Sequence, residues 1–260
     1  MAKIEKSWWH KRVRHLVARQ WSGMTRSEWR KRGVPSLELQ AEARELHDTL
    51  SHFLLRADGL HPSAVHAYAA SLAPGTDWRW QPGLLLNAVQ PSALLGIDPG
   101  ANLGHNVTLW HDCGRNALTI RQKRNDDRPQ QPAFALALEV YEFTGSYLSL
   151  SLNLPDDILP DLGAQFVVRL DLSMAAEQEI TVYARLNLVQ GPNVETVLRQ
   201  TGDPIAGQNN TRMIEFDLAY ADLVDRPIEK VWLDLIFEEP HMNAVTVSDL
   251  VMSRRPRAEI

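Results

Sequence analysis

The sequence predicts a mainly β protein, a jelly-roll-like antiparallel β-sandwich with an N-terminal α-helical extension. Three observations support this prediction. After Asn106, apolar residues recur at every second position, as in strands with one buried face. Few helical patterns separate these stretches, which excludes an α/β parallel sheet. Before residue 60, apolar residues instead recur at spacings of three and four.

Residues 1–60 form the predicted helical extension, which is basic as far as Pro35. After Pro35, a helix is expected to start at Ser36 and to end at Asp58-Gly59. Its apolar stripe consists of Leu39, Ala43, Leu46, Leu50, Phe53 and Ala57. This spacing places the stripe on one face of the helix.

Residues 61–106 are expected to form an ordered wrap across the body. Five prolines and several glycines exclude a continuous helix or a central strand here. Trp78 and Trp80 point to the same side of an extended chain. They are interpreted as a hydrophobic clamp, with a stacking platform as the alternative.

Residues 107–260 are predicted to form the sandwich itself. Leu148–Leu154 and Phe166–Met174 show the clearest alternation of apolar and polar residues. Further strands are expected at Val107–His111, Ala117–Gln122, Ala133–Phe143, Ile180–Leu188, Asn193–Gln200, Ile214–Leu218, Val231–Phe237 and Ala244–Arg254. The alternation slips between Val247 and Leu250, which predicts a β-bulge near Asp249.

The composition limits the class of protein. The chain has 260 residues, of which 44% are hydrophobic and 23% charged, which is typical of a globular chain. A single cysteine excludes a disulfide framework, and there is neither a secretory signal nor a long apolar run. We therefore expect a cytoplasmic protein, with association at the inner membrane surface as an option.

Several sequence blocks resemble a known family. They are Thr76–Trp80, Leu109–Cys113, Gly191–Asn193, Glu215–Leu218, Val231–Leu235 and the closing Ser253–Glu259. In this combination the chain resembles an uncharacterised alphaproteobacterial family, known as a domain of unknown function, over nearly its whole length. The resemblance implies a bacterial host. It brings no activity, cofactor or catalytic residue.

A polar and aromatic surface is predicted on the outward side of three strands. Its residues are Arg169, Asp171, Tyr183, Arg185, Asn187, Trp232 and Asp234. If the three strands share one sheet, these side chains form one surface that suits a carbohydrate-like ligand. The alternatives are cross-strand ion pairs on a solvated sheet, or a surface covered by other parts of the chain.

The sequence offers few groups for catalysis or metal binding. His111-Asp112-Cys113 places a thiol near an imidazole, but a buried structural cysteine is the favoured interpretation. Asp156, Asp157 and Asp161 are interpreted as a solvated acidic turn rather than a calcium site. We expect no metal and no cofactor.

The basic N-terminus combines tryptophan with cationic residues. The predicted membrane-contact residues are Trp8, Trp9, Lys11, Arg12 and Arg14. Such a helix can lie on an anionic membrane or dock on the acidic body. Nucleic acid is the least favoured partner, because the acidic body repels phosphates.

Together these features predict a non-enzymatic binding or accessory protein. Its polar sheet face is expected to recognise a carbohydrate-like ligand or a protein partner. Two alternatives stay open: a peripheral membrane adaptor that uses the N-terminal helix, and a sugar-processing enzyme in the mouth of the sandwich.

Overall fold

The computed structural model of the chain describes residues 15–24, 36, 38–39, 42–43, 46, 50, 73–104, 106–125 and 131–257. The chain divides into two compact units, Met1–Leu54 and Leu55–Ile260. Each unit is described by itself below. No helix among the described residues has the length and apolar character needed to cross a membrane.

The first unit is helical where it is described. Residues 15–24 are helical, as are 38–39, 42–43, 46 and 50. The Ser36 hydroxyl oxygen accepts a hydrogen bond of 3.3 Å from the Leu39 backbone N–H. This contact is that of a helix N-cap, so it agrees with the helix start predicted at Ser36.

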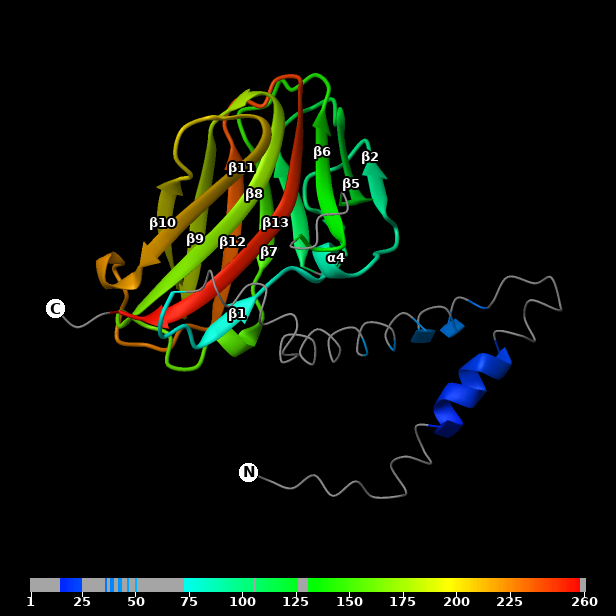
Figure 1. Cartoon of the computed structure of the whole chain (residues 1–260), viewed down its shortest axis with the longest axis horizontal. Helices are drawn as coiled ribbons and strands as arrows, with labels where there is room; N and C mark the ends of the chain where they lie inside the picture. The colour runs from blue at the N-terminus through cyan, green and yellow to red at the C-terminus, as the bar shows by residue number, and fades with distance from the viewer. Residues whose placement is uncertain are drawn as a thin grey trace. The chain divides into compact units, whose positions relative to one another are not determined.

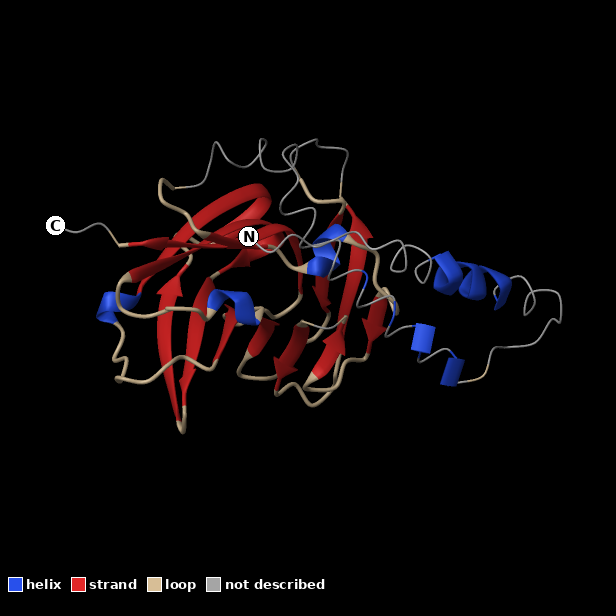
Figure 2. Cartoon of the chain, turned by 90° about the horizontal axis from the view of Figure 1, so that it is seen from below, coloured by secondary structure: helices blue, strands red, loops and turns tan. Residues whose placement is uncertain are grey.

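The second unit is a sandwich of two antiparallel sheets, and Figure 2 shows its two layers of strands edge on. The seven-stranded sheet has the order β11-β8-β13-β6-β5-β2, with β1 paired to β13. It consists of β1 (Trp78–Trp80), β2 (Ala93–Leu95), β5 (Leu118–Arg124), β6 (Phe134–Val140), β8 (Phe166–Ile180), β11 (Ile205–Asp217) and β13 (Asn243–Pro256). In Figure 1 the long strands β11, β8 and β13 run side by side.

The six-stranded sheet has the order β10-β9-β12-β7-β4-β3. It consists of β3 (Ala101–Leu103), β4 (Val107–His111), β7 (Leu148–Asn153), β9 (Val182–Gln190), β10 (Asn193–Gln200) and β12 (Lys230–Phe237). The chain crosses between the sheets repeatedly, as from β6 to β7, from β7 to β8 and from β8 to β9. The predicted jelly-roll-like sandwich is therefore confirmed.

One apolar core fills the space between the sheets. Leu150, Leu170, Leu186 and Leu235 are at most 1% exposed and come from β7, β8, β9 and β12. Their sequence neighbours point to the outer faces, because successive side chains of a strand alternate in direction. The core is completed by α4 (Gly83–Leu86), with two short 3-10 helices, Asp156–Ile158 and Leu218–Tyr220, in the loops.

The segment predicted as a wrap, 61–106, contributes more to the sandwich than expected. It supplies β1, β2 and β3, which extend the two sheets ahead of Val107, and α4, whose Leu84 and Leu85 belong to the core. Trp78 belongs to the core cluster and Trp80 packs against it, as expected of a clamp. Asp157 accepts a 2.8 Å hydrogen bond from the Trp78 indole N–H, which fixes the ring.

The last strand contains the predicted bulge. The pairing of β13 with β8 shifts register between Val247 and Asp249. The shift lets Val247 and Leu250 both point into the core, where they are 6% and 1% exposed. The slip in the alternation therefore has the predicted cause.

Candidate functional site

A row of side chains that is polar from β9 to β3 crosses the outer face of the six-stranded sheet. Strand register places its members directly opposite one another from strand to strand. In order from β10 to β3 they are Leu198, Arg185, Asp234, Ser151, Thr108 and Asn102. We call these six residues the central row.

The Asp234 carboxylate is the centre of this row, although it is only 2% exposed. Its Oδ2 accepts hydrogen bonds from Arg185 Nε at 3.0 Å and Arg185 Nη2 at 2.9 Å. The same oxygen accepts from Asn187 Nδ2 at 2.9 Å, and Oδ1 accepts from the Ser151 hydroxyl. The buried charge is thus fully paired, which avoids the desolvation cost of an isolated carboxylate.

Arg185 is held by this network and still faces solvent. Its side chain is 41% exposed, and Nη1 has no hydrogen-bond partner among the described residues. The guanidinium is therefore fixed on one edge and free to donate from the other. A fixed donor loses less conformational entropy when it binds a ligand.

Asn102 and Thr108 continue the row toward the sheet edge. Thr108 Oγ1 donates to Asn102 Oδ1 at 2.6 Å, and Asn102 Nδ2 donates to the Gly100 carbonyl at 3.3 Å. Both side chains are oriented by these bonds.

Aromatic residues lie on both sides of the central row. Tyr183 and Trp110 both lie in the adjacent row on one side of the central row. They are three strands apart, so about 14 Å separates their positions in the sheet at the usual strand spacing. Trp232 occupies the row on the other side, opposite Asn187 and Asn153. The polar row is therefore flanked by rings.

Two of these rings carry polar neighbours. The Tyr183 hydroxyl lies 3.4 and 3.5 Å from the Glu238 carboxylate oxygens. Partial burial raises the pKa of Tyr183, and the negative charge of Glu238 raises it further. Lys230 Nζ lies 5.6 Å from the centroid of the Trp232 ring, within cation–π distance.

Trp110 belongs to this surface, and it was missed in the sequence analysis. It is 44% exposed, while its neighbours Leu109 and His111 are each 1% exposed. A Cβ built on Gly100 would lie 3.3 Å from two ring carbons of Trp110, so the indole rests against bare backbone. Trp110 lies between Leu109 and His111 in a predicted strand, so alternation places its side chain on the opposite, outer face. This alternation is the signal that could have identified it.

The prediction of one seven-residue surface is wrong in one respect. β8 lies in the seven-stranded sheet, so Arg169 and Asp171 are on the other side of the sandwich from the central row. Arg169 Nε and Nη2 donate to both oxygens of Asp171 at 2.6 to 3.1 Å. These two residues form an ion pair on a different face. Tyr183, Arg185, Asn187, Trp232 and Asp234 do share one face.

The His111-Asp112-Cys113 segment is arranged for structure rather than for nucleophilic catalysis. His111 Nδ1 accepts from the Cys113 backbone N–H at 3.2 Å, and Nε2 lies 2.8 Å from the Ile97 carbonyl oxygen. Both ring nitrogens are thus engaged by backbone, which leaves none to activate the thiol.

The neighbouring side chains have equally local roles. The Asp112 carboxylate accepts hydrogen bonds from the hydroxyl and the backbone N–H of Ser146. The bonds from the Ser146 side chain and from the Tyr147 amide hold the pKa of Asp112 below its usual range. The Cys113 thiol is 2% exposed and lies 3.7 Å from the Glu142 carbonyl oxygen.

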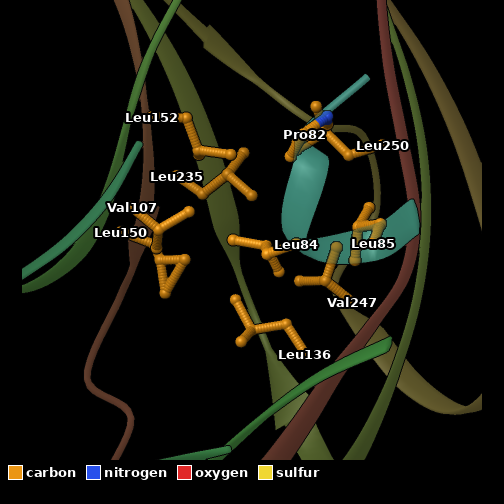
Figure 3. Close-up of a pocket in the computed structure, with 10 residues that line it drawn as sticks. All are labelled: Pro82, Leu84, Leu85, Val107, Leu136, Leu150, Leu152, Leu235, Val247 and Leu250. Carbon is orange, nitrogen blue, oxygen red and sulfur yellow. The ribbon is translucent and has the colours of Figure 1, made fainter. Parts of the chain in front are cut away.

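The described cavity between the two sheets is too small and too apolar to hold a sugar. The cavity, shown in Figure 3, has a volume of about 10 Å³. It is lined by Pro82, Leu84, Leu85, Val107, Leu136, Leu150, Leu152, Leu235, Val247 and Leu250. This volume is at the lower limit for one water molecule, and the lining offers no polar partner.

Other predicted sites contribute little to this picture. Within the described ranges, no group of three His, Cys, Asp or Glu side chains is arranged to hold a metal ion. In the acidic turn, Asp157 is engaged by Trp78. Trp8, Trp9, Lys11, Arg12 and Arg14 lie outside the described residues, so membrane contact through them stays a prediction.

Comparison with known proteins gives a family and distant structural likenesses. A family described as "Family of unknown function (DUF6478)" matches residues 1–260. No curated protein matches the chain. The expected alphaproteobacterial origin stays a prediction.

The structural likenesses are weak. The tailspike protein 4 enzymatically active domain of bacteriophage CBA120 is 11% identical with a TM-score of 0.41, covering 56% of this chain and 19% of that chain. The family 11 carbohydrate-binding module of Clostridium thermocellum is 11% identical with a TM-score of 0.39, covering 60% of this chain and 92% of that chain. The CBM22-1 xylan-binding domain of Paenibacillus barcinonensis Xyn10C is 10% identical with a TM-score of 0.37, covering 64% of this chain and 94% of that chain. Because these TM-scores are below 0.5, they carry no argument about a ligand.

Proposed function

The chain belongs to DUF6478, a family of unknown function, and we propose from its own residues that the outer face of the six-stranded sheet binds a carbohydrate. The observation that carries the proposal is the arrangement of an exposed ring, Trp110, and a half-buried ring, Trp232, beside a fixed polar row. Trp110 and Trp232 flank the row on opposite sides, and Arg185 lies in the row on β9, the strand next to that of Trp232, with an Nη1 that has no partner among the described residues.

Sugars suit this arrangement for a physical reason. One side of a sugar ring presents C–H groups, which stack on an aromatic face, while the hydroxyls need fixed hydrogen-bond partners. The Asp234 network holds Arg185 in place before a ligand arrives, and Gly100 lets the Trp110 ring lie against the backbone. Such preorganisation lowers the entropic cost of binding.

The length of the row favours an extended ligand. Six strands at the usual spacing span about 24 Å from β10 to β3. A chain of linked sugars can contact Arg185, Thr108 and Asn102 together, whereas a single sugar cannot.

The sugar-processing alternative fits the residues less well. Glycoside hydrolysis uses two carboxyl groups that act on one glycosidic bond. Both oxygens of Asp234 are already occupied, and Glu238 contacts the Tyr183 hydroxyl. Binding without chemistry is therefore the better interpretation of this face.

The test is affinity electrophoresis of the full chain through gels that contain soluble polysaccharides, followed by calorimetry on those that retard it. Trp110→Ala and Trp232→Ala should each weaken binding about tenfold or more, as loss of a stacking ring does. Tyr141→Ala is the matched control, because Tyr141 is 52% exposed and follows β6 in the other sheet.

Circular dichroism must show that the variants stay folded. Retardation by no polysaccharide would overturn the proposal. So would tryptophan variants that bind as well as the Tyr141 variant.

A further inference from the structure

We infer that the ligand of this face is an acidic polysaccharide, whose carboxylate contacts Lys230 and Arg185 beside the Trp232 ring. The inference rests on the proposed function and names the class of sugar. It comes from the charges that the face presents to solvent.

Arg185 and Lys230 differ in whether a carboxylate of the described residues already binds them. Arg185 shares two of its nitrogens with Asp234 and keeps Nη1. Lys230 is exposed, and in the part of the chain that the structure describes no carboxylate forms an ion pair with it. Its Nζ lies 5.6 Å from the centroid of the Trp232 ring.

Their positions place Trp232 between them. Lys230 precedes Trp232 by two residues on β12, so both side chains lie on the outer face. Arg185 is opposite Asp234, which follows Trp232 by two residues. A sugar stacked on Trp232 therefore has a cation on either side along the strand.

The carboxylates of the face do not offset this arrangement. Asp234 is 2% exposed and its charge is used by Arg185, Asn187 and Ser151. Glu238 lies at the other end of β12, beyond Phe237, and contacts Tyr183. Among the outward-facing side chains of β9 and β12 that lie nearest to Trp232, the charged groups that reach solvent are Lys230 and Arg185.

An anionic sugar gains more from these donors than a neutral sugar does. Hydrogen bonds between a cation and a carboxylate are about twice as strong as those between neutral groups. The whole chain is acidic, with a net charge of −5, and this opposes the approach of an anion. At 0.15 M salt the Debye length is about 8 Å, so the distant charges are screened while the contacts at Trp232 persist.

The experiment compares polygalacturonate and alginate with their carboxyl-reduced, neutral forms in calorimetry on the full chain at 0.15 M salt. We expect an acidic form to bind at least about tenfold more tightly than its reduced form. Lys230→Gln should remove most of this preference and leave the affinity for the reduced form unchanged. Lys123→Gln is the matched control, because Lys123 is an exposed lysine of β5 in the other sheet.

The outcomes separate this inference from the proposed function. Neutral polysaccharides that bind as tightly as acidic ones, with loss on Trp232→Ala, would overturn the acidic ligand and leave carbohydrate binding intact. A Lys230→Gln variant that keeps the full preference would also overturn it. If neither acidic nor neutral polysaccharides bind, both proposals fail.

Discussion

Arg185 and Asp234 lie directly opposite each other on β9 and β12, and two guanidinium nitrogens of Arg185 donate to the same carboxylate oxygen. The exposed arginine is thus positioned by a buried acid. Because Ser151 and Asn187 bind the same carboxylate, this contact links β7, β9 and β12 on the outer face. The geometry of the candidate site therefore depends on residues that a ligand does not touch.

Asp234→Ala should lower the free energy of unfolding by about 2–4 kcal/mol. The change leaves the Asn187 and Ser151 side chains without their buried partner and frees Arg185. Urea denaturation measures the loss. Asp171→Ala should cost less than about 1 kcal/mol, because its ion pair with Arg169 is partly exposed. Equal losses for the two variants would contradict the network at Asp234.

Leu170→Ala and Leu235→Ala should each destabilise the protein by about 2–5 kcal/mol, because truncation of a buried leucine leaves a cavity. Both side chains are 0% exposed and come from different sheets. Leu198→Ala, at a 50% exposed position, should change stability by less than about 0.5 kcal/mol. Denaturant midpoints in the reverse order would mean that the strand faces are assigned backwards.

Gly100→Ala should both destabilise the fold and disturb the candidate site. Gly100 has φ of +84°, a conformation that costs an alanine about 1 kcal/mol or more. The new methyl group would also press on the Trp110 ring at 3.3 Å. Thermal denaturation measures the first effect. Polysaccharide affinity measures the second, and an unchanged affinity would show that the placement of Trp110 does not matter.

Cys113 should react slowly with a thiol reagent in the native protein and rapidly after denaturation. Burial raises the pKa of this thiol, but hydrogen bonds from the backbone at Thr144 and Arg115 outweigh it and lower the pKa overall. Access therefore limits the reaction, because the side chain is 2% exposed. Fast labelling of native protein would instead support a reactive nucleophile.

The strands could be predicted because half-buried strands leave an alternation in the sequence. Val107–His111 and Asn193–Gln200 begin and end where the alternation indicated. β1, β2 and β3 were not predicted as strands, since each has three residues and lies among prolines. A stretch of three residues is too short to show a period of two.

The site was predicted in part for a related reason. Alternation assigns each residue to a face of its own strand, which placed Arg185, Trp232 and Asp234 correctly on an outer face. It does not say which strands share a sheet, so Arg169 and Asp171 were grouped with residues of the other sheet. Pairing depends on contacts between distant segments, and no local pattern records them.

Asp249 should make the stability of the protein fall as pH rises. Its side chain lies at the bulge of β13, where Gln81 Nε2 donates to it at 2.7 Å and the residue is 6% exposed. Burial raises the pKa of this carboxyl from 3.8 to about 7, although a hydrogen bond from the Leu250 amide opposes the rise.

The pH window follows from the two ionisation states. Between about pH 4 and pH 7 the folded protein keeps a proton on Asp249 that the unfolded chain has lost, so unfolding becomes easier as pH rises. Asp249→Asn stays neutral at every pH and keeps an acceptor for Gln81. Its stability relative to the unmodified protein should therefore increase by about 2–4 kcal/mol between pH 4.5 and pH 8. Urea denaturation across this range measures the difference, and parallel curves for the two proteins would show that Asp249 ionises in the folded state as it does in the unfolded chain.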